Sequence, residues 1–347
     1  MTNFQSLTSL GWSPFFQQQL TLEEWEQTIP ARIFEQQKSI LTATTDTSNI
    51  SIPVHHSMPE MTVGDWVLLD KEQNFLRLLD RKSCFKRKAA GIQQRFQLIA
   101  SNVDTAFILM SMNLDFNLNR LERYLSLVNE AGVEPVVILT KSDLVTSTEE
   151  WQQQILAMDN TLAVIPVNAF ERSCLDTLSP WLSLGKTCVL LGSSGVGKST
   201  LTNTLIGKPQ QLTNEIRLQD AKGRHTTTSR SLLKLENGGL VLDTPGMREL
   251  QLADCETGIS ATFADIEGLS SECRFKDCQH INEPGCAVIT AVESGQITQR
   301  RLSSYHKLIR EEANNSASIA EKRAKEKSFG KFVKHTMKQA YKLKGRD

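Results

Sequence analysis

The chain has 347 residues and a formal net charge of zero, with 39 Lys and Arg against 39 Asp and Glu. This length accommodates two or three domains of roughly 100–200 residues each. Zero net charge excludes a general attraction to polyanions, so only local charged segments can provide one. The chain starts without a basic stretch followed by an apolar one, and its apolar runs are far too short to cross a bilayer. We therefore expect a cytoplasmic protein with no membrane partner, whose seven cysteines stay reduced and are metal ligands or buried apolar residues rather than disulfides.

The first part of the chain predicts short strands after a polar extension. Residues 1–30 are rich in glutamine and contain scattered aromatic residues, which predicts an extension with a short helix. Residues 31–98 contain apolar segments at 32–34, 65–69 and 75–78, separated by turn-rich pieces. Closely spaced strands without long helices indicate a small β-barrel.

From Asn102 the pattern changes to apolar strands that alternate with helical stretches. The strands are expected at 106–110, 136–139, 162–167, 187–191 and 240–242. The helical face is clearest for Leu118, Leu121, Leu125 and Val128. This alternation predicts an α/β fold with a mostly parallel sheet covered by helices. Beyond about residue 250 the chain contains Cys and His and then becomes helical and basic, so the predicted division is 1–30, 31–98, 99–250 and 251–347.

A glycine-rich loop follows the strand expected at 187–191 and precedes a helical run at 200–206. It fits the phosphate-binding pattern GxxxxGK[ST] and reads Gly192-Ser193-Ser194-Gly195-Val196-Gly197-Lys198-Ser199-Thr200. The glycines let successive N–H groups point at a β-phosphate, and the helix N-terminus adds its positive dipole end. We expect these residues to bind a nucleotide, with Lys198 at the β- and γ-phosphates and Ser199 on Mg²⁺. A simple Gly/Ser turn is the alternative, and the motif does not separate ATP from GTP.

A guanine-recognition motif is expected after the strand that ends at residue 139. Thr140-Lys141-Ser142-Asp143 is similar to the motif NKxD. The Asp143 carboxylate can accept hydrogen bonds from N1–H and the 2-amino group of guanine, a donor pair that adenine lacks. The Lys141 stem can pack on the base. Thr140 replaces the usual Asn, and its hydroxyl can still tie this loop to the phosphate loop. In isolation the segment is equally well a surface turn.

Two more strand ends supply candidate ligands. After the strand at 162–167, Asn168-Ala169 offers a backbone N–H for guanine O6. After the strand at 240–242, Asp243-Thr244-Pro245-Gly246 fits DxxG, in which Asp243 suits Mg²⁺, through water, and the Gly246 N–H suits a γ-phosphate. In the polar segment 223–228 we select Thr227 as the threonine that completes Mg²⁺ coordination.

The residue after DxxG departs from the pattern of many GTPases, which place there a glutamine that orients the attacking water. This chain has Met247, and a thioether cannot orient or deprotonate water usefully. Either turnover is intrinsically slow or another group acts. His225 is the candidate base, with an exposed loop histidine as the equal alternative. His225 and Lys198 are the predicted catalytic residues, and Arg224 and Arg230 are weaker candidates for stabilising transition-state charge.

The order of the motifs is informative in itself. Base recognition comes first, then the Ala-containing loop, the phosphate loop, the switch and DxxG, whereas an ordinary GTPase starts with the phosphate loop. Sheet packing depends on spatial neighbours, so cutting a surface loop and joining the old ends preserves the fold. The sequence thus predicts a circularly permuted P-loop GTPase domain that binds GTP or GDP with Mg²⁺. Whatever follows DxxG is attached to the second switch, so nucleotide state is expected to move it.

The C-terminal region contains a cluster of metal-ligand residues. They are Cys273, Cys278, His280 and Cys286. Three thiolates and one imidazole suit one structural Zn²⁺, because four protein ligands leave no open position. Free thiols in a loop are the alternative. The other cysteines lack such spacing and are expected to be packing residues; they are Cys84, Cys174, Cys188 and Cys255.

Two basic segments stand out on this neutral chain. Residues 321–347 contain ten Lys and Arg against three Asp and Glu, with Phe329, Phe332 and Tyr341 between them. A second basic run at 81–88 is expected to close the barrel. Each run alone is more often a solvated face, but together with a β-barrel they indicate contacts with RNA phosphates.

The combination of motifs resembles the ribosome small subunit-dependent GTPase A family (RsgA/YjeQ type) over nearly the whole chain. The resemblance lies in residues 102–104, 120–125, 139–144, 192–200, 223–228, 243–246 and the four zinc ligands. It implies an N-terminal OB-type β-barrel, a circularly permuted GTPase and a C-terminal zinc-binding helical domain. It also implies GTP hydrolysis stimulated by the small (30S) ribosomal subunit and its rRNA, a role in late maturation of that subunit, and His225 as the family's proposed catalytic histidine. A monomer is expected.

Two other interpretations remain open at this stage. One is an RNA-binding zinc protein with a vestigial nucleotide site, against which Lys198, Ser199 and Asp243 argue because a dead site needs none of them. The other is a P-loop ATPase, against which Asp143 and the permuted order argue. Displacement with GDP and ADP separates the ATPase from the GTPase.

Overall fold

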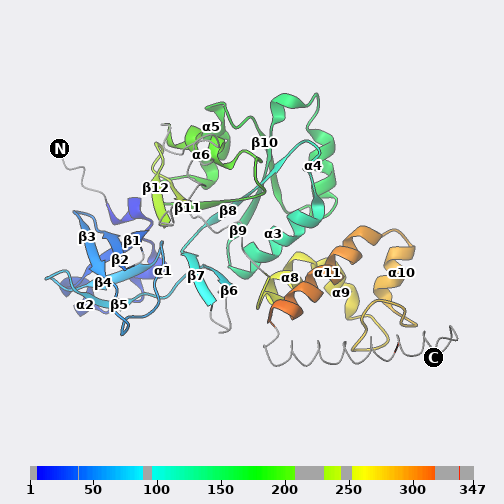
Figure 1. Cartoon of the computed structure of the whole chain (residues 1–347), viewed down its shortest axis with the longest axis horizontal. Helices are drawn as coiled ribbons and strands as arrows, with labels where there is room; N and C mark the ends of the chain where they lie inside the picture. The colour runs from blue at the N-terminus through cyan, green and yellow to red at the C-terminus, as the bar shows by residue number, and fades with distance from the viewer. Residues whose placement is uncertain are drawn as a thin grey trace, which may run out of the picture.

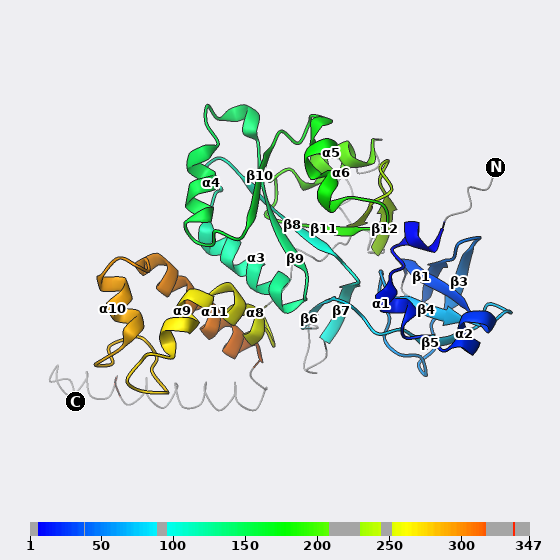
Figure 2. The same ribbon diagram turned by 180° about the vertical axis from the view of Figure 1, so that it is seen from behind.

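A computed structural model of the chain describes residues 6–37, 39–88, 96–207, 230–243, 252–316 and 336. Antiparallel strands from the N-terminal part, a central sheet with helices on its faces and a group of C-terminal helices follow one another along the long axis (Figure 1). The view from behind shows the same order, with the C-terminal helices beneath the long helix α3 (Leu118–Glu130) and far from the N-terminal strands (Figure 2). None of the helices in these described ranges is long and apolar enough to cross a membrane.

Five antiparallel strands make up the N-terminal end of an 11-stranded sheet. They are β1 (Ile29–Gln36), β2 (Ile40–Thr44), β3 (Asn49–Pro53), β4 (Trp66–Leu69) and β5 (Phe75–Leu78). β1 pairs with both β2 and β4, and β4 pairs with β5. Alternate side chains such as Ala31 and Ile33 are buried in a core that β2, β3 and β4 share, as the period of a half-buried strand requires. These pairings are compatible with a barrel, and its closure stays a prediction.

The segment before β1 is packed onto these strands. It contains η1 (Leu7–Leu10), α1 (Pro14–Gln17) and α2 (Leu22–Gln27). The Trp12 ring meets the buried Trp66 ring edge-on, with 4.8 Å between centroids, and Leu10 and Phe16 are buried in the same cluster. The fully buried Arg32 guanidinium donates to the Leu10 carbonyl oxygen at 2.6 Å. The predicted extension is therefore part of the folded molecule, because burial of its aromatic side chains contributes favourable free energy to folding.

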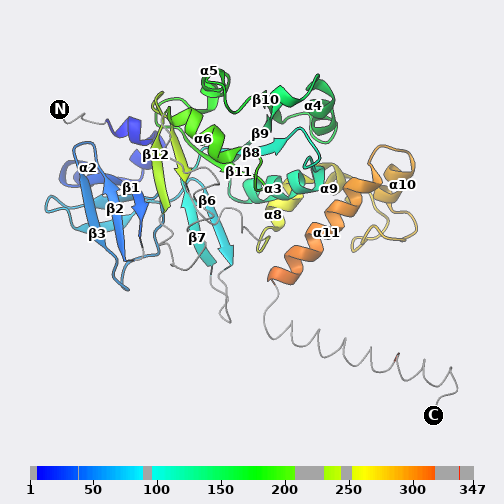
Figure 3. The same cartoon turned by 45° about the horizontal axis from the view of Figure 1, so that its top comes forward.

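The basic run at 81–88 lies in a hairpin outside the large sheet. The hairpin consists of β6 (Cys84–Lys88) and β7 (Phe96–Ser101). The Cys84 N–H donates to the Ala131 carbonyl at the end of α3 at 3.1 Å, and Lys88 Nζ donates to the Asn315 carbonyl at 2.5 Å. The hairpin also bonds the N-terminal part, because the Ser101 N–H donates to the Val63 carbonyl at 3.0 Å. It lies between the N-terminal strands and the C-terminal helices (Figure 3), and closure of the barrel by this run stays a prediction.

The central part of the large sheet is mostly parallel. It contains β8 (Thr105–Ser111), β9 (Glu134–Thr140), β10 (Ala163–Val167), β11 (Thr187–Leu191), β12 (Arg230–Lys234) and β13 (Leu240–Asp243). The spatial order is β10-β9-β8-β11-β13-β12, followed by β1. Only β12 runs antiparallel to its neighbours β13 and β1. Every residue of β8 and β11 is buried, which explains why these strands read as continuous apolar runs.

Helices cover both faces of this sheet. Besides α3 they include α4 (Glu149–Leu156), α5 (Ser173–Leu178) and α6 (Lys198–Ile206), with short turns η2 (Ser142–Leu144) and η3 (Ser179–Trp181). Ala106 and Ile108 of β8 pack in one core with Leu121 of α3. Phe107 points the other way, into a second core with Leu201 of α6. The alternation along β8 thus fixes a helix layer on each side.

The C-terminal helices are docked on α3 through buried charges. They are α8 (Glu256–Thr262), α9 (Ala264–Ser270), α10 (Ala287–Glu293) and α11 (Gln299–Ser316). Glu122 of α3 is completely buried, and its carboxylate accepts hydrogen bonds at 2.9 Å from Arg300 and Arg301 of α11. Arg301 also pairs with Asp265 of α9 at 2.6 Å. The C-terminal helices are therefore held by the helix that follows β8 as well as by the chain that follows β13.

Candidate active site and metal centre

Within the described residues, four strands that precede predicted nucleotide-binding motifs end at the same side of the central sheet. The parallel strands β9, β10 and β11 end at Thr140, Val167 and Leu191, and β13 ends at Asp243. Val167 lies opposite Thr140 in the strand register. Ligands of open α/β sheets bind at such carboxyl ends. The segments that follow these strands come from distant parts of the chain but begin at the same ligand-binding side of the sheet.

The phosphate loop occupies residues 192–197, between β11 and α6. Gly192, Gly195 and Gly197 have φ of +146°, +76° and +106°, conformations that glycine adopts without strain. A Cβ on Gly192 would lie 2.7 Å from the Leu109 carbonyl oxygen of β8, so the close approach also requires glycine there. Lys198 opens α6, and its Nζ donates to the carbonyl oxygens of Gly192, at 2.7 Å, and Ser193, at 2.5 Å. The ammonium group therefore lies against the loop that is expected to hold phosphates.

One base-recognition loop contacts the phosphate loop directly, and the other contacts the helix α6 that follows it. The buried Thr140 hydroxyl donates to the Val196 carbonyl at 2.7 Å, which is the tie expected from its hydroxyl group. A Cβ on Gly197 would lie 3.8 Å from Thr140 and 3.9 Å from the Ala169 methyl group. The Thr204 hydroxyl of α6 donates to the Ala169 carbonyl at 2.7 Å. Two predicted motifs are thus in contact, and the third is bonded to the helix that follows the phosphate loop, although all three are separated in the sequence.

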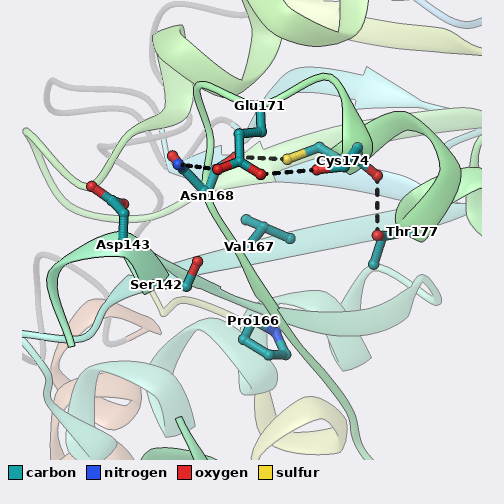
Figure 4. A pocket seen from close by; sticks show the side chains of 9 residues that line it. Ser142, Asp143, Pro166, Val167, Asn168, Glu171, Cys174 and Thr177 are labelled. Carbon is teal, nitrogen blue, oxygen red and sulfur yellow. Dashed lines mark hydrogen bonds between the residues drawn. The ribbon is translucent and has the colours of Figure 1, made fainter. Parts of the chain in front are cut away.

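A pocket of about 260 Å³ lies between the two base-recognition loops (Figure 4). Asp143 and Asn168 come from successive loops and both line it. Lys141 has φ of +63°, which turns the chain into η2 so that Ser142 and Asp143 face the pocket. The Asn168 amide donates to Glu171 at 2.8 Å, and its carbonyl oxygen accepts from the Phe170 N–H. The Asp143 side chain is exposed, as an acceptor for a base must be.

Asp115 is a neighbour of the phosphate loop that the sequence analysis missed. It lies between β8 and α3, and its Oδ2 accepts from the Ser193 hydroxyl at 2.5 Å. The Ser193 hydrogen bond and then the Arg120 guanidinium hold the pKa of Asp115 below its ordinary value. The signal was available, because the loop after every parallel strand of this sheet lies at the ligand-binding edge.

Several predicted residues lie outside the part of the chain that the structure describes. These are Arg224, His225, Thr227, Gly246, Met247 and the basic segment 321–347 apart from Thr336. Asp243 is described in its backbone as the last residue of β13. Ser199 and Thr200, in the first turn of α6, are half-buried.

The four predicted metal ligands lie together in the C-terminal region. One ligand atom from each of Cys273, Cys278, His280 and Cys286 lies within 4.8 Å of all the others. The two Sγ atoms of Cys273 and Cys286 are 3.8 Å apart, and His280 Nδ1 lies 3.7 and 3.3 Å from them. Tetrahedral zinc with Zn–S near 2.3 Å and Zn–N near 2.0–2.1 Å separates two sulfurs by about 3.8 Å and sulfur from nitrogen by about 3.6 Å. The donor set and its spacing therefore fit a closed tetrahedral metal site.

Neighbouring groups orient these ligands. The Ser270 hydroxyl lies 2.8 Å from His280 Nε2, which leaves Nδ1 to face the thiols, as in metal sites whose histidines are held by an outer partner. His280 itself has φ of +56°, an uncommon conformation for a residue with a side chain. Cys286 is the N-cap of α10, and its sulfur accepts from the Ile289 N–H at 3.4 Å.

Comparison with known proteins gives a consistent result. A family model described as RsgA GTPase matches residues 78–253, about half of the chain. A protein of Vibrio vulnificus named small ribosomal subunit biogenesis GTPase RsgA 2 is 53% identical over 99% of both chains. A protein of the same name from Vibrio parahaemolyticus is 52% identical over 95% of this chain and 92% of its own. The RsgA protein of Mesorhizobium japonicum is 44% identical over 90% of this chain and 91% of its own.

Solved structures agree in fold. The structure of YjeQ from Thermotoga maritima has a TM-score of 0.61 at 24% identity, covering 81% of this chain and 97% of that one. The structure titled YloQ, a circularly permuted GTPase, has a TM-score of 0.60 at 24% identity, covering 84% and 96%. The predicted permuted α/β fold is thereby confirmed. With its strand-end motifs, its permuted order and its close relatives, the chain belongs to the RsgA GTPase family and is a GTP-hydrolysing enzyme.

Proposed function

We propose that GTP binds at the carboxyl edge of the central sheet, across residues 192–200, 140–143 and 168–169. The observation that carries this proposal is the hydrogen bond from the Thr140 hydroxyl to the Val196 carbonyl, together with that from Thr204 of α6 to the Ala169 carbonyl. Asp143 and Asn168, which lie in the same two base-recognition loops, line one pocket of about 260 Å³. Asp143 would accept from guanine N1–H and the 2-amino group, and the Ala169 N–H would donate to O6.

The chemistry at the phosphates follows from the residues around them. Mg²⁺, when bound with GTP, neutralises charge on the β- and γ-phosphates. Its proposed ligands, Ser199, Asp243 and Thr227, offer the oxygen donors that this ion prefers. Ser199 is in the first turn of α6, after β11, and Asp243 is the last residue of β13, the strand that pairs with β11. Lys198 stabilises the charge that develops on the transferred phosphoryl group. The Gly246 N–H contacts the γ-phosphate, and His225 activates the attacking water in place of the glutamine that Met247 replaces.

The metal cluster is proposed to bind one structural Zn²⁺. Cys273, Cys278, His280 and Cys286 supply four ligands, so no position stays open for a substrate. The ion would fix the loop between α9 and α10. In this division the N-terminal strands form an OB-type barrel at about 31–98, the permuted GTPase covers 99–250 and the zinc-binding helices begin at 251.

The partner is proposed to be the small (30S) ribosomal subunit and its rRNA. Relatives that match this chain over nearly their whole length are named for the biogenesis of that subunit. We infer that the chain, as a cytoplasmic monomer, assists late maturation of the subunit, and that the subunit stimulates GTP hydrolysis. The GTPase family assignment argues against the alternative of an RNA-binding zinc protein with a vestigial nucleotide site.

Two measurements test this function. GTP turnover is compared with and without purified small subunits, with large subunits as the control; we expect stimulation by small subunits alone, and equal rates in all three would reject the proposed partner. In the second, Asp143→Asn exchanges an acceptor for an amide. This variant is expected to lose preference for guanine and gain affinity for xanthine nucleotides, whereas unchanged GTP preference would reject the assigned base contact.

A further inference from the structure

The loop between β8 and α3 places a carboxylate against the phosphate loop. Asp115 Oδ2 accepts from the Ser193 hydroxyl at 2.5 Å, and Asp115 Oδ1 accepts from Arg120 at 2.8 Å. The nucleotide chemistry described above uses neither the Asp115 carboxylate nor the Arg120 guanidinium. A hydroxyl donor and a carboxylate at this distance form a charge-assisted hydrogen bond, which is stronger than a neutral one.

The carboxylate is held in place from both sides of its own loop. The Asn113 side-chain oxygen accepts from the Ser111 hydroxyl at 2.8 Å and from the Asp115 N–H at 2.9 Å. Asn117 caps α3 by accepting from the Arg120 N–H at 3.1 Å, which fixes the helix turn that carries Arg120. Asp115 is therefore anchored to the end of β8 and to the first turn of α3.

A negative charge beside a phosphate-binding loop is unfavourable unless neighbouring cations compensate it. Arg120 pairs with Asp115 directly, and the charge of Lys141, in the base-recognition motif, also stabilises the Asp115 carboxylate. With two cations beside it, the net repulsion of bound phosphates is small. The main effect of Asp115 on the loop is therefore its hydrogen bond with the Ser193 hydroxyl.

We propose that Asp115 is a positioning residue for the nucleotide site: it ties Ser193 of the phosphate loop to the first turn of α3 and thereby keeps the loop ordered for the phosphates. Thr140 holds the far end of the same loop through the Val196 carbonyl. The loop is thus fastened at two points by side chains from the ends of β8 and β9. Ordering the loop before binding lowers the entropy that the nucleotide must overcome, so the effect falls on affinity and KM rather than on kcat.

The test uses the full chain with Mg²⁺ and measures the Kd of GDP and GTP together with kcat and KM. The variants are Asp115→Ala, Ser193→Ala and their combination. Because Asp115 is partly exposed to solvent, the ordinary net contribution of a hydrogen bond applies, which corresponds to about a three- to tenfold loss of affinity in each single variant, with KM raised in proportion and kcat changed far less. The double variant is expected to be no weaker than either single one, because both remove the same interaction.

Two further variants make the result specific. Asp115→Asn keeps an acceptor oxygen, so it is expected to bind nucleotide more tightly than Asp115→Ala. This variant also replaces Asp115→Ala in the test if Asp115→Ala fails to fold. Glu24→Gln weakens the comparable ion pair between Glu24 of α2 and Arg77 of β5, in the N-terminal part of the chain, and is expected to leave nucleotide affinity unchanged.

The proposal is overturned by additive losses in the double variant, by unchanged Kd in Asp115→Ala, or by tighter binding in that variant, which would mean that charge repulsion dominates. It rests on the nucleotide site proposed above. The preference of the unmodified chain for GDP over ADP tests that site separately: a chain that prefers GDP but ignores Asp115→Ala rejects only this inference.

Discussion

The nucleotide site and the metal cluster are built in opposite ways. The metal ligands lie within residues 273–286, and their four ligand atoms are all within 4.8 Å of one another. The nucleotide site instead joins Thr140 to Val196, 56 residues further along the chain, and Ala169 to α6. The first depends on one loop and the second on the order of strands in a sheet. Local spacing is therefore enough to find the cluster, whereas the nucleotide site is recognisable only once the strand ends are known to share an edge.

The largest expected effect tests whether the two regions are independent. Substituting Cys286→Ser removes a metal ligand, and structural zinc contributes roughly 10–16 kcal/mol of apparent binding free energy in small zinc domains. We expect metal content to fall from one ion to none and the fold around α9 and α10 to be lost. Metal analysis and circular dichroism measure this. GDP affinity is expected to change less than threefold, and a large loss would show that the regions are coupled.

The next effect concerns α3, whose Arg120 pairs with Asp115 beside the phosphate loop and whose Glu122 pairs with α11. Glu122→Ala leaves Arg300 and Arg301 without their buried carboxylate, and breaking a buried ion pair costs about 3–5 kcal/mol. We expect a fall of this size in the free energy of unfolding, at its lower end because Asp265 still pairs with Arg301. Glu311→Ala, which removes the partly exposed pair with Arg123, is the control and should cost about 1 kcal/mol or less. Equal losses in denaturant unfolding would contradict the interpretation of Glu122 as the main anchor.

Lys198→Ala sharpens the comparison at the nucleotide site alone. Removing one preorganised donor to transition-state charge typically lowers kcat about 10²–10³-fold. We expect such a loss in GTP turnover with metal content unchanged. Lys186→Ala is the matched control. Lys186 lies just before β11, at the end opposite the phosphate loop and near Asp104, so this variant should keep its GTP turnover. A kcat within tenfold of the unmodified protein would remove Lys198 from its proposed role.

The smallest effect tests the contact between two distant loops. Thr140→Val removes the hydroxyl that donates to the Val196 carbonyl, which costs about 1 kcal/mol, or roughly fivefold in nucleotide affinity. Thr187→Val is the control: Thr187 is buried at the amino end of β11, and its hydroxyl has no hydrogen-bond partner in the described part of the chain. Isothermal calorimetry with GDP should separate the two variants. Equal affinities would show that the Thr140 tie does not order the loop.

Much of this molecule can be predicted from sequence where the signal is local or periodic. The strand at 187–191 and the buried face of α3 have the expected bounds because continuous burial and helical spacing leave a direct pattern. The phosphate loop is predictable because its glycines and lysine are required by backbone conformation and charge.

The rest of the fold and of the site depends on contacts between residues that are distant in the sequence, which no local pattern predicts. Trp12 contacts Trp66, but the sequence around Trp12 is typical of a polar extension. Glu122 pairs with Arg301, but in the sequence it is typical of a solvent-exposed helix face. Asp115 was missed for a related reason, since its role depends on Ser193 of a neighbouring strand end. That β6 and β7 form a sheet of their own was also not predictable, because a basic strand does not show which sheet it joins.

The buried carboxylate of α3 has a consequence for synthesis of the chain. Arg300 follows Glu122 by 178 residues, so at roughly 5–20 residues per second translation needs roughly 9–36 s to supply it. During that interval the nascent chain holds an unmatched acidic group on the helix beside its phosphate loop. The central sheet can form before α11 is translated. The docking of the C-terminal helices on α3, however, must wait until α11 has been synthesised.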